Sequence, residues 1–91
     1  MAEIVVRFWS LVVAIHSRET LQHHRPHFHV TDAEHTASVA IDDGEVLAGY
    51  MRPVTHHAIR ALVRARGPEL MAAWNDVRAG RKPVKIHFVP K

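Results

Sequence analysis

The feature that most constrains this chain is a change of hydrophobic period near Pro53. Before that proline, apolar and polar residues alternate, as in strands whose successive side chains point to opposite faces. After it, apolar residues recur every three or four positions, as on one face of a helix. Because one element cannot satisfy both periods, the sequence predicts strands within residues 4–51 and helices after them.

The strands are expected to form an antiparallel meander of three to four members. The segment "HFHVT" (27–31) alternates and directs Phe28 and Val30 toward the core. The segment "DDG" (42–44) predicts a hairpin, because Asp and Gly tolerate the positive φ of tight turns. The run from Val5 to His16 is apolar on both faces and predicts one central or dimer-buried strand.

Two helices, at about 53–66 and 68–79, are expected to follow and to pack on one face of the sheet. Gly67 suits the end of one helix and Pro68 the first turn of the next. Trp74 lies on the apolar stripe of the second helix, so we expect it in the core. The segment "VKIHFV" (84–89) permits a short last strand. The prediction is a single α+β domain over residues 1–91.

Composition and charge narrow the function. There is no cysteine, which excludes disulfides and thiolate metal sites. The early apolar run 11–15 is far shorter than the ~20 residues of a membrane helix, so we expect a cytoplasmic protein without membrane contact. Residues 1–51 carry three Arg and seven Asp or Glu, whereas 52–91 carry nine Lys or Arg and two Asp or Glu. This asymmetry favours an acidic protein partner or DNA or RNA for the basic half, although basic helices can also be merely well solvated.

The basic half would make this contact through exposed positions of its helices and of the segment after them. The residues predicted to bind are His56, Arg60, Arg64, Arg78, Arg81, Lys82 and Lys85. This binding hypothesis requires no cofactor.

Histidines in "LQHHRPHFHV" (21–30) indicate chemistry of a different kind. His27 and His29 share one strand face about 6.5–7 Å apart along the strand, directed away from the helices. His16 of the first strand is expected to join them, with Phe8 and Val12 on the same open face, where a homodimer would form. Such histidines can also be purely structural.

Two reactive alternatives use these histidines. A Zn or Ni site would take its ligands from His16, His27, His29 and Glu34. Alternatively, His27 and His29 would act as acid and base in cleaving RNA, as a small endoribonuclease or phosphodiesterase, with Arg18 or Arg25 holding the phosphate.

Three segments carry a family resemblance: "RPHFHV" (25–30), "AIDDGEVLAGYMRP" (40–53) and "ELMAAWNDVRAGRKPVKI" (69–86). On these segments the chain resembles the small bacterial proteins of the domain of unknown function 4160 family, over essentially its whole length. The resemblance implies no established enzymatic activity. It implies a gene that is paired with one of the domain of unknown function 2442 family, in the manner of toxin–antitoxin pairs. The prediction is therefore a small, non-enzymatic interaction protein bound to a cognate small protein.

Overall fold

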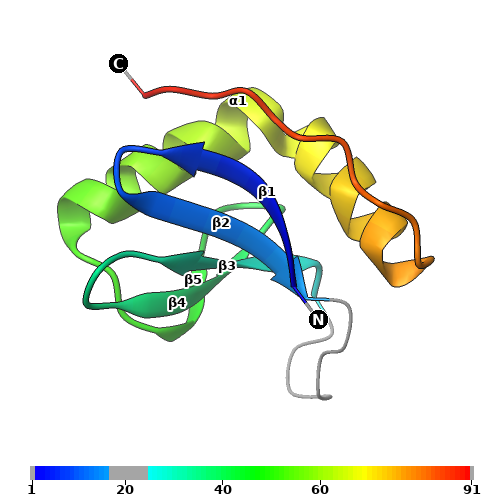
Figure 1. Ribbon diagram of the computed structural model, residues 1–91. Helices are drawn as coiled ribbons and strands as arrows, with labels where there is room; N and C mark the ends of the chain where they lie inside the picture. Colours follow the sequence, from blue (N-terminus) through cyan, green and yellow to red (C-terminus); the bar gives the residue numbers. More distant parts are fainter. Residues whose placement is uncertain (1, 17–24, 91) are drawn as a thin grey trace.

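Antiparallel strands come first and a helix follows, in the order that the change of period predicts. The computed structural model describes residues 2–16 and 25–90. These residues form a five-stranded meander, hydrogen-bonded in sequence order, and one C-terminal helix (Figure 1). The bounds are β1 Ala2–Phe8, β2 Leu11–His16, β3 His27–Thr31, β4 Thr36–Ala40, β5 Val46–Gly49 and α1 Pro53–Arg78. The predicted α+β class is confirmed.

The core lies between one face of the sheet and one side of α1. Val13 of β2 pairs with Val30 of β3, and Phe28 pairs with Val39 of β4, so apolar side chains form a continuous layer. The expected burial of Phe28 and Val30 is confirmed. Burying a side chain of this size contributes about 1.5–3 kcal/mol. The fully buried residues that α1 adds to this core are Ile59, Leu62 and Leu70.

β1 and β2 form a hairpin that the sequence did not reveal. Phe8 pairs with Leu11, and Trp9 and Ser10 make the turn, with Trp9 at φ 54°. The prediction of a single strand from Val5 to His16 is wrong, and the described residues hold five strands instead of three to four. The turn escaped notice because it contains no Gly, Asn, Asp or Pro, the residues that usually mark a positive φ or a tight turn.

α1 runs from Pro53 to Arg78 as one element where two separate helices were predicted, and it consists of two helical segments that meet at a kink. The expected boundary appears as a kink, with Arg66 at φ −130° and ψ 23°. Pro68 lacks an N–H and crowds the preceding turn, which explains the kink. The helix continues because Leu70, Trp74 and Val77 extend the buried stripe past the kink. No helix in the described part of the chain combines the length and apolar character that membrane crossing requires.

The segment after α1 is extended but forms no strand, contrary to the expectation for 84–89. Ile86 donates its N–H to the Val5 carbonyl at the bulge of β1, where the strand register shifts. An irregular edge of this kind interrupts a regular ladder. Phe88 of this segment lies 5.5 Å, centroid to centroid, from Phe8. Phe8 is therefore buried, whereas the sequence placed it on the open face of the sheet.

A substitution at Gly49 tests how closely β5 approaches the backbone of β4. Gly49 has φ +80°, and a Cβ there would lie 2.2 Å from the Thr36 carbonyl oxygen. We expect Gly49→Ala to lower the free energy of unfolding by at least about 3 kcal/mol, measured by denaturant titration. Gly67→Ala is the matched control, because nothing lies within 4 Å of its new methyl group. Gly67→Ala should leave the free energy of unfolding unchanged or raise it by about 0.5–1 kcal/mol. Equal effects of the two substitutions would contradict the steric argument.

Candidate functional site

Three of the predicted histidines lie together at one end of β2 and β3. The ring centroids of His16 and His29 are 4.0 Å apart, and those of His29 and His27 are 5.5 Å apart. The strand register explains this contact, because Ala14 pairs with His29 and directs the following residues of β2 along β3. We call His16, His29 and His27 the imidazole row.

His27 is buried against the helix. Its exposed fraction is 1%, and its ring centroid lies 5.2 Å from that of Trp74 in α1. The expectation that His27 faces away from the helical half is therefore wrong, while the expected burial of Trp74 is confirmed. Alternation does place His27 opposite Phe28, but the second half of α1 passes the strand ends and covers His27 as well (Figure 1).

A hydrogen bond assigns the tautomer of His27. Its Nδ1 lies 2.8 Å from the Arg25 carbonyl oxygen. A carbonyl oxygen only accepts, so Nδ1 carries the hydrogen and, in the neutral ring, Nε2 is the acceptor. His29 has a weaker neighbour, since its Nδ1 is 3.5 Å from Ser38 Oγ. In the row, His27 is thus oriented by a backbone carbonyl, and the rings of His16 and His29 lie in tilted contact.

Trp74 connects the imidazole row to a cation, Arg78. The Arg78 guanidinium lies over the Trp74 ring, 5.2 Å from its centroid. This is a cation–π arrangement, which orients the guanidinium at the surface beside a buried histidine. Arg78 therefore belongs with the imidazole row and not with the basic residues of the first half of α1.

The described residues do not assemble a Zn or Ni site. No group of three described His, Cys, Asp or Glu side chains is placed to hold a metal ion. Glu34 lies in the turn between β3 and β4, where its N–H is donated to Asp32 Oδ1. It does not complete a ligand set with His27 and His29. Arg18, the residue predicted to hold a phosphate, lies outside the described residues.

Arg25 is held by the β4–β5 hairpin. Its guanidinium donates to Glu45 at 2.9 Å, to Asp42 at 2.7 Å and to Asp43 at 3.2 Å. The bonds to Glu45 and then Asp42 raise the pKa of Arg25 further above its ordinary value. The acidic turn thereby ties down the segment that enters β3. The three carboxylates of this turn pair with Arg25, which was the alternative to Arg18 for holding a phosphate.

Exposed arginines recur every fourth or eighth position at the start of α1. Arg52, Arg60 and Arg64 are exposed, and we call them the arginine ridge. His56, predicted to join them, is half-buried, and its Nε2 lies 2.9 Å from the Gly44 carbonyl oxygen. His56 therefore fastens α1 to the hairpin. Arg52 was missed in the sequence, although its four-residue spacing from His56 was visible.

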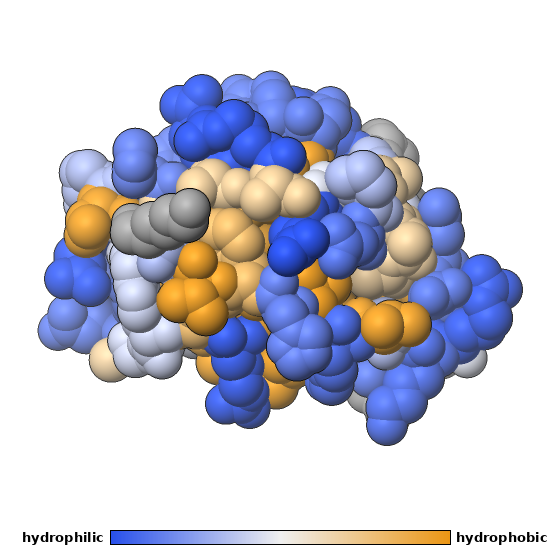
Figure 2. All heavy atoms as spheres, turned by 90° about the horizontal axis from the view of Figure 1, so that it is seen from above, coloured by the Kyte–Doolittle hydropathy of each residue, from blue (hydrophilic) through white to orange (hydrophobic). Residues whose placement is uncertain are grey.

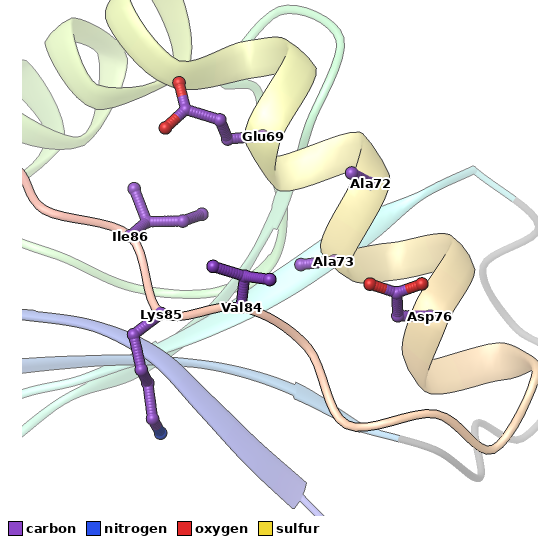
Figure 3. Close-up of a pocket in the computed structure, with 7 residues that line it drawn as sticks. All are labelled: Glu69, Ala72, Ala73, Asp76, Val84, Lys85 and Ile86. Carbon is purple, nitrogen blue, oxygen red and sulfur yellow. The ribbon is translucent and has the colours of Figure 1, made fainter.

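The remaining predicted basic residues lie far from the ridge or are engaged. Arg78 follows Arg64 by 14 residues, about 21 Å along a straight helix. Arg81 pairs with Asp76 at 3.0 Å, and Lys85 donates to the Ile4 carbonyl. Figure 3 shows Lys85 beside a hollow of ≈ 240 Å³ between α1 and the last segment, with its side chain directed toward β1. The predicted set therefore does not form one face.

A second feature was missed entirely. Trp9 is 61% exposed at the β1–β2 turn and borders a groove of ≈ 440 Å³ against α1 and the last segment. Its only sequence signal was a tryptophan beside Ser10 inside a run that otherwise resembled a strand.

Comparison with known proteins adds one finding. A family model described as Domain of unknown function (DUF4160) matches residues 11–75. This range includes the arginine ridge and all three histidines of the imidazole row. No curated protein and no solved structure matches the chain.

Removal of the His27 ring tests whether it is part of the core. We expect His27→Ala to lower the free energy of unfolding by about 2–4 kcal/mol, because it leaves a cavity against Trp74. His29→Ala, at the half-buried neighbouring position, should cost clearly less. Chemical denaturation of both variants measures the difference. A His27→Ala protein as stable as the wild type would contradict the burial argument.

Acidification should weaken the β4–β5 hairpin. The pKa of Asp43 is lowered from its ordinary 3.8, first by the Glu45 N–H and then by Arg25. The folded state thus binds this proton less tightly than the unfolded chain, so its stabilisation is complete above pH 3.8 and disappears as pH falls through the lower folded pKa. Unfolding measured from about pH 6 to 2 should show this loss, and Asp43→Asn should reduce the slope. An identical slope in the variant would exclude Asp43 as the source.

Proposed function

The chain belongs to the domain of unknown function 4160 family, and we propose that it is a small interaction protein that binds an acidic partner through the arginine ridge. The observation that carries this proposal is the distribution of ion pairs. Most carboxylates of the described residues are engaged within the protein, while the ridge is exposed and unbalanced. A partner that supplies negative charge would balance the positive charge of the ridge.

The carboxylates are occupied as follows. Asp42, Asp43 and Glu45 pair with Arg25, Glu69 pairs with Arg66, and Asp76 pairs with Arg81. Asp32 accepts the N–H groups of Glu34 and His35.

The arginine ridge has no such partner. Among the described residues, no carboxylate oxygen lies within 4.0 Å of the Arg52, Arg60 or Arg64 guanidinium. Asp43 and Glu45 share a shallow hollow with Arg60, but Arg25 already binds both. Arg64 lies one turn further from the hairpin. Uncompensated surface charge of one sign steers an oppositely charged partner and contributes to specificity.

We take the cognate partner to be a small cytoplasmic protein, as in a toxin–antitoxin-like pair. The support is the family membership together with the gene pairing that the resemblance implies. A protein of the domain of unknown function 2442 family is therefore the partner to test first. DNA or RNA would meet the same charge requirement through its phosphates, and its binding would depend steeply on salt.

An endoribonuclease or phosphodiesterase using His27 and His29 is the second candidate. The closeness of the two imidazoles favours it, because the ring centroids of His27 and His29 lie 5.5 Å apart. We rank it second because the 1% exposure of His27 leaves almost no surface for a substrate.

Charge reversal tests the ridge. We expect Arg60→Glu/Arg64→Glu to weaken binding of a domain of unknown function 2442 protein at least tenfold, because each new carboxylate repels the acidic surface. Arg78→Glu/Lys82→Glu makes the same change of charge at the other end of α1 and should have a much smaller effect. Calorimetric titration gives both affinities, and circular dichroism verifies folding.

Equal losses in the two double variants would contradict a localised ridge. Tight binding of a 20-base-pair DNA duplex that is lost in Arg60→Glu/Arg64→Glu and falls steeply with salt would identify a nucleic acid as the acidic partner instead.

A further inference from the structure

The geometry points to a specific occupant for the groove beside Trp9: the apolar side of an acidic amphipathic helix from a partner protein. This inference rests on the proposed function and adds the partner's secondary structure and its point of contact. The groove lies along the first half of α1, next to the arginine ridge. Five observations carry the inference: the groove's lining, its dimensions, the conformation of Trp9, the charges around the groove and the engagement of the chain's own carboxylates.

The groove is mainly apolar, with His57 as its polar lining residue and with aromatic rings, Trp9 and Phe88, along one side. Val54, Ala61 and Ala65 line it from α1, and Phe88 and Val89 line it from the last segment. Phe8 lies under the turn, 5.5 Å from the Trp9 ring and 5.5 Å from the Phe88 ring. Figure 2 looks onto the side of the molecule formed by α1 and the last segment and shows apolar patches among polar side chains. Val54 and Val89 are 59% and 75% exposed, so the groove is open to a ligand.

Trp9 is placed at a cost that the fold does not require. Its φ of 54° is a conformation that Gly, Asn or Asp adopts with less strain, and its indole is 61% exposed. A smaller polar residue would suit both the turn and the solvent. A strained, exposed aromatic side chain at the rim of an apolar groove is typical of a contact residue for a partner.

The charges around the groove select an acidic partner. Arg60 and Arg64 each directly precede a groove residue, Ala61 and Ala65, so these two arginines lie about 100° around α1 from the groove. None of the described residues that line the groove carries a carboxylate. A ligand seated in the groove would thus meet His57 at the groove itself and the Arg60 and Arg64 side of α1 beyond it.

The dimensions favour a helix. Ala65 follows Val54 by 11 positions, about 16 Å or three turns of α1. The side chains at positions 58, 61 and 65 are alanines and project little from α1. Another helix axis can therefore approach within about 8–10 Å. Anchors at i, i+4 and i+7 of such a helix would meet the groove along its length.

The described residues of a second copy of this chain do not supply the required surface. The described helix is α1, and its two acidic residues, Glu69 and Asp76, are paired with Arg66 and Arg81. The acidic hairpin is likewise occupied by Arg25. The complementary helix must therefore come from a different protein.

A synthetic probe tests the inference directly. The probe is a labelled 14-residue helical peptide with leucines at i, i+4, i+7 and i+11 and glutamates on the flanks, beside a version with lysines on the flanks. We expect the full chain to bind the glutamate peptide at least tenfold more tightly than the lysine peptide, measured by fluorescence anisotropy. Equal affinity for the two peptides would overturn the charge argument.

Groove variants locate the contact. Trp9→Asn removes the indole and keeps a residue that tolerates the turn, and Ala61→Glu adds a carboxylate to the groove without altering the ridge. Each should weaken peptide binding at least tenfold. Val84→Asn is the matched control, because Val84 is 78% exposed but lies outside the groove, and it should bind as the wild type does. Unchanged binding in both groove variants would overturn the inference.

The same variants separate this inference from the proposed function. If Arg60→Glu/Arg64→Glu abolishes binding of the domain of unknown function 2442 protein while Trp9→Asn and Ala61→Glu retain it, the groove is wrong and the ridge stands. If the ridge variant binds normally, the proposed function itself fails. A homodimer that Trp9→Asn converts to a monomer, by light scattering, would show that a second copy fills the groove and would also overturn the inference.

Discussion

Burial of one apolar sheet face by α1 is the constraint on which the rest of this structure depends. The meander places Val13, Phe28 and Val39 on that face, and α1 covers them with a stripe that runs from Ile59 to Val77. To keep the stripe on the sheet, the helix accepts a kink at Arg66 instead of ending there. That continuity brings Trp74 and Arg78 past the strand ends and onto the histidines of β3.

The same docking determines how charge is distributed over the surface. α1 meets the acidic hairpin at His56 and Gly44, while the hairpin's carboxylates turn to Arg25. Each local pairing removes a negative charge that would otherwise neutralise the helix. Positive charge therefore remains along Arg52, Arg60 and Arg64, and the proposed partner contact follows from this imbalance. The exposed groove beside it would supply the apolar area that charge alone cannot provide.

The histidines illustrate why a residue pattern underdetermines chemistry. Alternation placed His27 and His29 on one face, and the pairing of β2 with β3 brought His16 to them. Metal binding or acid–base catalysis would need those rings to meet a substrate or further ligands. Instead His27 is fixed by the Arg25 carbonyl and packed on Trp74, which makes it part of the core boundary. The proposed association therefore draws on surfaces of the protein other than these histidines.

The sequence by itself determined the class of fold, the inward direction of Phe28 and Val30, the hairpin at 42–44 and the helical stripe, because these depend on local periodicity and turn preference. It could not show that Trp9 makes a turn or that Pro68 kinks a helix without ending it, since both outcomes oppose local preference and are decided by packing across the sheet. Only the tertiary structure decided which cations are engaged. Ion pairs such as those of Arg25 join residues about 20 positions apart, and their formation depends on strand register and helix docking. The Trp9 groove is likewise built from three separate segments, so it could not be predicted from any single stretch of the chain.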